Sequence, residues 1–238
     1  MEKTKEYREL TVADIKTAAD KIRKALKEEN SRLKSWEYCY KIFGEKRNKT
    51  DAEMYNETVD LLSLHLGFYL ASWGMYRGSS FLLQKDYKVH NEAVEMLLNK
   101  KYDSLRGASL EDLKKDETLT LLFELKSELN EIYSKEKPKN AKEGVTDTLL
   151  SKIIMGVFGC CPAYDENVTT CLKQYGISAA SFSKKSVLSL IKFFEEHKDI
   201  KSVVNEECKK INSEAGLSEV EYPQMKVIDS ILWQLGKN

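Results

Sequence analysis

A glycine-flanked arginine and two serines form the first group of residues whose types suit binding chemistry. They lie in the segment YLASWGMYRGSSFLLQK, residues 69–85, where glycines interrupt a helical pattern. Arg77, Ser79 and Ser80, with nearby backbone N–H groups, can hold an anion such as a phosphate. The aromatic residues that can stack on a base beside them are Trp73, Tyr76 and Phe81. The alternative is structural: Gly78 makes a turn, Ser79 caps a following helix, and the aromatic residues belong to the core.

The histidines and cysteines lack the spacing of a metal site or a catalytic triad. His65 lies in an apolar run and is expected to be a hydrogen-bonded core histidine, whereas His90 and His197 lie beside charged residues and are expected at the surface. The five cysteines, at positions 39, 160, 161, 171 and 208, show neither Cys-x-x-Cys nor disulfide-framework spacing. We therefore expect reduced, mostly buried thiols and no metal site. A Walker-type phosphate loop is also absent from the sequence.

A second segment, GVTDTLLSKIIMGVFGCCPAYDENV at residues 144–168, combines a glycine-led turn with an apolar helix that stops near Pro-Ala-Tyr-Asp. Gly144 can take the positive φ of a tight turn, and Thr146 or the residue after it can cap the apolar helix. Pro162 is expected to end that helix. Asp165 is then placed to cap the next one.

This arrangement resembles the helix-hairpin-helix DNA glycosylase superfamily. In that family, the hairpin presents backbone N–H groups to a DNA phosphate. An aspartate at the head of the following helix stabilises positive charge on the sugar as the base leaves. The resemblance implies the hairpin role for Gly144, Val145 and Thr146, and the catalytic role for Asp165.

The sequence also departs from this family. Thr146 replaces the usual second hairpin glycine, and Thr148 stands near the position of the lysine nucleophile of bifunctional members, with Lys152 one turn further on. The resemblance therefore implies a monofunctional base-excision enzyme or a relative that only binds DNA. The iron–sulfur cluster of some members has no counterpart, because only Cys208 lies beyond residue 171, so we expect no cofactor.

Two interpretations of Asp165 remain open. Base excision builds oxocarbenium character on the sugar, which a carboxylate in a dry pocket stabilises. An aspartate that only caps a helix needs no catalytic purpose. Under the first interpretation, the residues expected to contact nucleic acid beside the hairpin are Lys139, Lys142, Arg77, Ser79 and Tyr164.

Apolar residues at helical spacing run through the rest of the chain, and strand patterns are almost absent. The expected helix faces include Ile15, Ala18, Ala19, Ile22 and Leu26; Leu122, Leu125, Leu129 and Ile132; and Val187, Leu190, Ile191 and Phe194. Thr11 with Asp14 resembles a capping box before the first of these faces, Ser183 can cap the helix of the third, and the last helix is expected to begin at Pro223. We expect an all-α protein of about ten helices in two packed lobes, with residues 55–73 buried. The polar segment SKEKPKNAKE, residues 134–143, suggests lobes at 1–133 and 144–238, unless the chain forms one domain.

Composition limits the partners. The 38 basic and 38 acidic residues give no net charge, so binding of nucleic acid would need a local basic patch. The first residues lack the apolar stretch of a signal peptide, and the uncharged run 61–76 is too short to span a bilayer. We therefore expect a cytoplasmic protein without a membrane partner. Two functions stay open: a DNA glycosylase-like protein whose partner is DNA, and a non-enzymatic helical module that binds a protein partner.

Overall fold

The fold is all-α, as predicted. The computed structural model describes residues 7–47, 55–137, 145–179, 181–214 and 216–237, and no strand occurs among them. Eleven α-helices lie in these ranges. They are α1 (Val12–Lys27), α2 (Lys34–Arg47), α3 (Tyr55–Ser72), α4 (Asn91–Leu97), α5 (Leu110–Leu113), α6 (Asp116–Glu136), α7 (Asp147–Phe158), α8 (Glu166–Gln174), α9 (Lys184–Glu196), α10 (Lys198–Ser213) and α11 (Gln224–Leu235). Three 3-10 segments accompany them: η2 (Phe81–Gln84), η3 (Tyr87–His90) and η4 (Lys100–Leu105).

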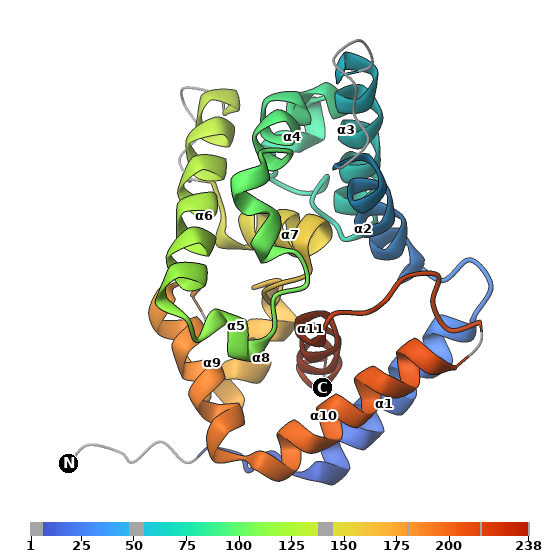
Figure 1. The fold of residues 1–238 in the computed structure, drawn as a ribbon, viewed down its shortest axis with the longest axis vertical. Coiled ribbons are helices and arrows are strands. Elements are labelled where there is room, and N and C mark those ends of the chain that lie inside the picture. Colours follow the sequence, from blue (N-terminus) through green and yellow to red (C-terminus); the bar gives the residue numbers. More distant parts are fainter. Residues whose placement is uncertain (1–6, 48–54, 138–144, 180, 215, 238) are drawn as a thin grey trace.

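The helices form two groups that meet at α7 and α11 (Figure 1). One group contains α2, α3, α4 and α6, and the other contains α1, α8, α9 and α10. The first helix therefore packs with the last two, α10 and α11, although it is far from them in sequence. The division of the chain at residues 134–143 stays a prediction, since residues 138–143 lie outside the described ranges.

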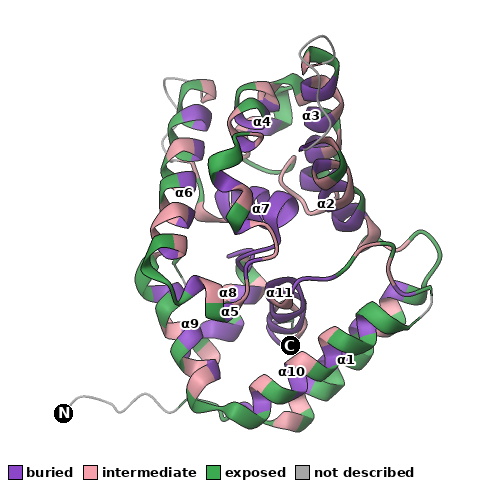
Figure 2. Cartoon of the chain, viewed as in Figure 1, coloured by how far each residue is buried: buried purple, intermediate pink, exposed green. Residues whose placement is uncertain are grey.

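Helix α7 lies at the centre of the core (Figure 2). Every residue from Leu149 to Phe158 is buried. Gly156 allows α3 to approach α7 closely, because a Cβ atom at this position would lie 2.5 Å from Cε1 of Tyr69. The helix ends at Gly159, whose φ of +63° is left-handed. The prediction that Pro162 ends it is therefore wrong: the chain leaves the helical path three residues earlier.

Side-chain caps agree with the sequence at three helix starts. Thr11 forms a capping box with Asp14 at the start of α1, Ser183 caps α9, and Asp165 caps α8. In the loop between α3 and η2, the residue that caps the following helix is Ser80 and not Ser79. The helix α11 begins one residue after Pro223, not at it.

Two predictions of burial are wrong. His90 is fully buried and not at the surface. Its burial is tolerated because both ring nitrogens have partners: Nε2 lies 2.7 Å from the hydroxyl of Tyr76, and Nδ1 lies 2.7 Å from the hydroxyl of Tyr133. On α3, Leu64 and Phe68 are 50% and 55% exposed, so one apolar face of this helix is not covered.

The predicted state of the cysteines is confirmed. All five are free thiols, and four of them are buried. No helix within the described residues has both the length and the apolar character that crossing a bilayer requires.

Candidate functional site

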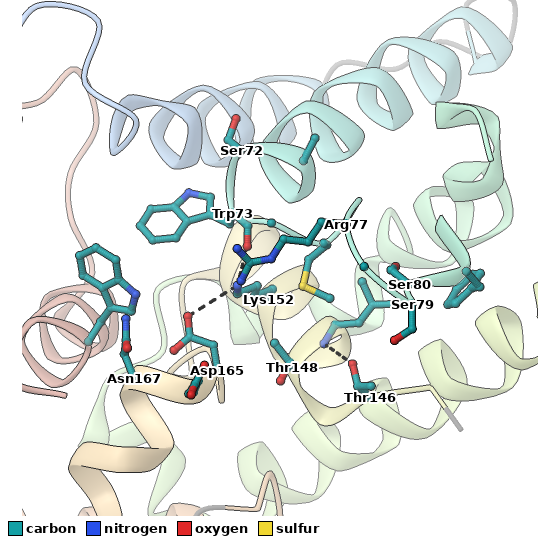
Figure 3. Close-up of a pocket in the computed structure, with 18 of the residues that line it drawn as sticks. Ser72, Trp73, Arg77, Ser79, Ser80, Thr146, Thr148, Lys152, Asp165 and Asn167 are labelled. Carbon is teal, nitrogen blue, oxygen red and sulfur yellow. Dashed lines mark hydrogen bonds and ion pairs between the residues drawn. The ribbon is translucent and has the colours of Figure 1, made fainter. Parts of the chain in front are cut away.

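A cavity of about 1130 Å³ opens beside the start of α7 and α8 (Figure 3). Its wall brings together the two segments that the sequence singled out. Arg77 and Ser79 come from the loop after α3, Thr146 comes from the start of α7, and Asp165 comes from the start of α8. This volume lies just above the range of roughly 300–1000 Å³ for small-molecule sites, so the cavity has room for a ligand of nucleotide size.

The two carboxylate oxygens of Asp165 have different partners. Oδ1 accepts a hydrogen bond of 3.1 Å from the backbone N–H of Val168, which caps α8. Oδ2 lies 3.6 Å from Nζ of Lys152 on α7, on the cavity side (Figure 3). Capping and a role in the cavity are therefore compatible in one side chain.

The loop before Asp165 is held by side chains from two helices. The carboxylate of Asp229 on α11 accepts the backbone N–H of Ala163 at 2.8 Å. On α7, Ser151 Oγ accepts the N–H of Tyr164 at 2.8 Å, and Thr148 Oγ1 donates to the carbonyl of Tyr164 at 2.9 Å. These bonds fix the backbone on which the next residue stands, which is the rigid support that a preorganised site needs.

Lys152 was not among the predicted site residues. It is 5% exposed, and its Nζ donates a 2.8 Å hydrogen bond to the carbonyl of Trp73. Burial lowers the pKa of Lys152, although the charges of Asp165 and Asp229 oppose this shift. One sequence signal was available: Lys152 is the single charged residue in the apolar run LLSKIIMGVF.

Burial also favours the uncharged form of Asp165. It raises the pKa of the carboxyl group, against the opposing charge of Lys152 and the hydrogen bond from Val168. Low hydration thus favours the uncharged form of both groups. A lysine with a lowered pKa holds more of the unprotonated amine, which is the nucleophilic form. The pair therefore combines an amine that is a nucleophile in its unprotonated form with a carboxyl group that stabilises positive charge in its ionised form, which the hydrogen bond from Val168 favours.

The cavity wall is positively charged in a chain without net charge. Five cationic side chains line it: Arg32, Arg77, Lys137, Lys152 and Lys237. Two acidic side chains, Asp165 and Glu166, face the same space. With all of these groups ionised, the wall has an excess of three positive charges, and with Lys152 unprotonated it keeps an excess of two. This excess is the local basic patch that binding of a polyanion would require.

The other predicted site residues differ in position. Thr146 caps α7 by accepting the N–H of Leu149 at 3.2 Å and also lines the cavity. Val145 is half-buried and packs against the core. Gly144, Lys139 and Lys142 lie outside the described residues.

The expectation for Tyr164 is corrected. This side chain is 2% exposed, and its hydroxyl lies 3.0 Å from Oγ of Ser186 in the core. A buried tyrosine of this kind cannot contact a nucleic acid at the surface. The residue stabilises the loop before Asp165 and does not line the cavity.

Comparisons of this chain with protein-family models, with curated proteins and with solved structures give no match. Within the described residues, no group of three or more His, Cys, Asp and Glu side chains is placed to hold a metal ion.

Proposed function

We propose that this protein is a base-excision enzyme that acts on a nucleotide flipped out of DNA. The observation that carries the proposal is the pair of the buried Lys152 and the partly buried Asp165, 3.6 Å apart, on the wall of a positively charged cavity. An enzyme that reacts at the sugar of a base-paired nucleotide must first take that nucleotide out of the helix, so it needs a cavity of this size.

The two groups have complementary roles in the proposed reaction, which departs from the monofunctional enzyme that the sequence resemblance implies, because Lys152 offers an amine beside Asp165. The unprotonated amine of Lys152 attacks C1′ of the sugar, and the bond from C1′ to the base breaks. The bonding electrons leave with the base, which takes up a proton. The ionised carboxylate of Asp165 stabilises the positive charge that grows on the sugar ring during this step. The amine proton released by Lys152 passes to solvent or to the departing base.

The surroundings of the pair support this chemistry. Arg77 has no ion-pair partner among the described residues and stands on the cavity wall, so its charge is available to a DNA phosphate. Trp73 and Phe81 line the same cavity and can stack on a base. The sequence resemblance to helix-hairpin-helix glycosylases implies the same role for Asp165.

The test compares base release by the wild type, Asp165→Asn and Lys152→Gln on duplexes that carry alkylated, deaminated or oxidised bases. Asparagine can still accept the N–H of Val168, so Asp165→Asn should stay folded. It should lose several powers of ten in rate, since each ~1.4 kcal/mol of lost stabilisation is about tenfold. Glutamine can still donate to the Trp73 carbonyl, but it offers no amine, so Lys152→Gln should also be inactive.

Asp86→Asn is the matched control, because Asp86 caps η3 with its side chain and does not line the cavity. It should leave both melting temperature and base release unchanged. A wild type that releases none of these bases, or an Asp165→Asn variant as fast as the wild type, would reject the enzyme.

One observation favours the second candidate function, a module that binds a protein partner. Leu64 and Phe68 expose apolar surface side by side on α3, one helical turn apart. If the base-release assay fails, replacing both with serine and measuring partner retention is the next experiment.

A further inference from the structure

A smaller cavity of about 200 Å³ adjoins the one that contains Asp165. Four residues line both cavities: Arg32, Trp73, Trp233 and Lys237. Trp73 follows α3, Trp233 belongs to α11, and the two cations lie before α2 and after α11. Residues from distant parts of the chain thus form a shared wall, and the proposed reaction gives no role to three of them, Arg32, Trp233 and Lys237.

The two indole rings hold the two cations in place. The rings contact each other edge to face, with centroids 5.4 Å apart. Lys237 Nζ lies 3.6 Å from the ring centroid of Trp233, and the Arg32 guanidinium lies 4.8 Å from that of Trp73 and 5.5 Å from that of Trp233. Contacts of this kind orient a cation without neutralising it.

The positive charge on this wall is not balanced. No described carboxylate forms an ion pair with Arg32, Lys237 or the neighbouring Lys21. Burial and the positive charges of Arg32 and Lys21 lower the pKa of Lys237, the direction expected for cations that lie close together.

Three further charged groups face the smaller cavity. Asp229 is engaged by Lys226 at 2.9 Å, so its charge is already matched, and Glu28 is an exposed carboxylate at the rim. The wall thus keeps an excess of positive charge after its acids are counted. An anion that entered between Arg32 and Lys237 would remove their repulsion.

We propose that Arg32 and Lys237 form a site for one backbone phosphate of the bound nucleic acid strand. The proposal rests on the proposed function, because it adds a contact for the strand that carries the excised base. In Figure 3, Lys152 lies between Trp73 and Ser79, and Asp165 lies below Lys152. Because Arg32 and Lys237 line the same cavity as the reacting pair, a strand whose phosphate they bind would lie close to that pair.

Phosphate suits these two residues better than a single carboxylate does. A guanidinium can bind a phosphate through two parallel hydrogen bonds, and a second cation can share the remaining oxygens. Nucleic acid offers such groups at regular spacing along a strand, and neutralising them gives binding that weakens as salt increases.

The test measures equilibrium binding of a fluorescent duplex to wild type and to the double variant Arg32→Gln/Lys237→Gln over a series of salt concentrations. We expect about tenfold weaker binding at low salt. We also expect the slope of log K against log salt to fall by about 0.9, the value for one lost phosphate contact on B-DNA. The matched control is Lys185→Gln/Lys209→Gln, which removes two exposed cations that line neither cavity and should change neither quantity.

Further measurements on the same proteins separate the outcomes. Melting temperatures check folding, and Arg32→Lys, which keeps the charge but loses the paired hydrogen bonds, should show an intermediate loss. Inorganic phosphate is added as a competitor, with the fluorescence of Trp73 and Trp233 as the signal, and only wild type should respond.

Unchanged duplex affinity and slope in a folded double variant would overturn the phosphate site. If that variant still released bases at the wild-type rate, the proposed enzyme would stand without this contact. If the wild type bound duplex through these cations but released no base, the phosphate site would stand and the enzyme would fail. A response to inorganic phosphate without any duplex binding would overturn the nucleic acid as the source of the phosphate.

Discussion

Replacing Asp229 with asparagine should destabilise the protein by about 3 kcal/mol. Asp229 and Lys226 on α11 are both buried, at 6% and 4% exposure, and their charged atoms lie 2.9 Å apart. Asparagine can still accept the N–H of Ala163, but it leaves Lys226 buried without a countercharge. Removing one partner of a buried ion pair costs about 3–5 kcal/mol.

The lower end of that range applies to Lys226, because its Nζ also lies 5.2 Å from the ring centroid of Trp36 and 5.6 Å from that of Trp73. These contacts remain in the variant and are worth about 1 kcal/mol. Since stabilities of native proteins are about 5–15 kcal/mol, the loss is readily measured by urea unfolding followed by circular dichroism.

The variant to compare with Asp229→Asn is the double variant Lys226→Met/Asp229→Asn, which removes both charges and keeps the acceptor for the N–H of Ala163. It should be more stable than Asp229→Asn alone, within about 1 kcal/mol of the wild type. A double variant that is as unstable as the single one would refute the reasoning. The loss of stability would then come from a weakened contact with the loop that contains Ala163, and not from an unpaired charge on Lys226.

Two other changes test the fold. Gly156→Ala places a methyl group 2.5 Å from a ring carbon of Tyr69 and should cost about 1–3 kcal/mol in urea unfolding, but much less in a Tyr69→Leu background; equal costs in the two backgrounds would contradict the clash. Burial lowers the pKa of His90 from 6.5 to about 4, so as the pH falls through this window the unfolded chain takes up a proton that the native protein does not. Between pH 7 and 4 the wild type should therefore lose about 3 kcal/mol more stability than His90→Gln, at about 1.4 kcal/mol for each pH step; parallel pH profiles would show that His90 is not held neutral.

Local rules account for what could be predicted from the sequence. Apolar spacing identified the buried faces of α1, α6 and α9, and the capping preferences of Thr11, Ser183 and Asp165 identified three helix starts. These features depend on residues within one or two helical turns. The same rules failed at Gly159, where a glycine at positive φ ended the helix before the proline could.

Long-range contacts account for what could not be predicted. His90 has charged residues two positions away on either side in sequence, Lys88 and Glu92. Its burial instead follows contacts with Tyr76 and Tyr133, which come from other elements. The sequence does not predict Lys152 as a nucleophile, because this residue stands one helical turn beyond the position where the resemblance places the lysine. Its nearness to Asp165 depends on how the loop from Gly159 folds back onto α7, and that path is fixed by contacts from α11.

The most direct test of the central claim is chemical trapping at Lys152. After the amine displaces the base, opening of the sugar ring gives an imine between Lys152 and C1′, which borohydride reduces to a stable bond. Wild type incubated with lesion-bearing duplex and borohydride should form a covalent complex, and peptide mapping should find the modified residue at Lys152. The yield should rise with pH as the unprotonated amine increases, and Lys152→Gln should form no complex. A wild type that releases the base without trapping, or a complex that persists in Lys152→Gln, would contradict the proposed role of this lysine.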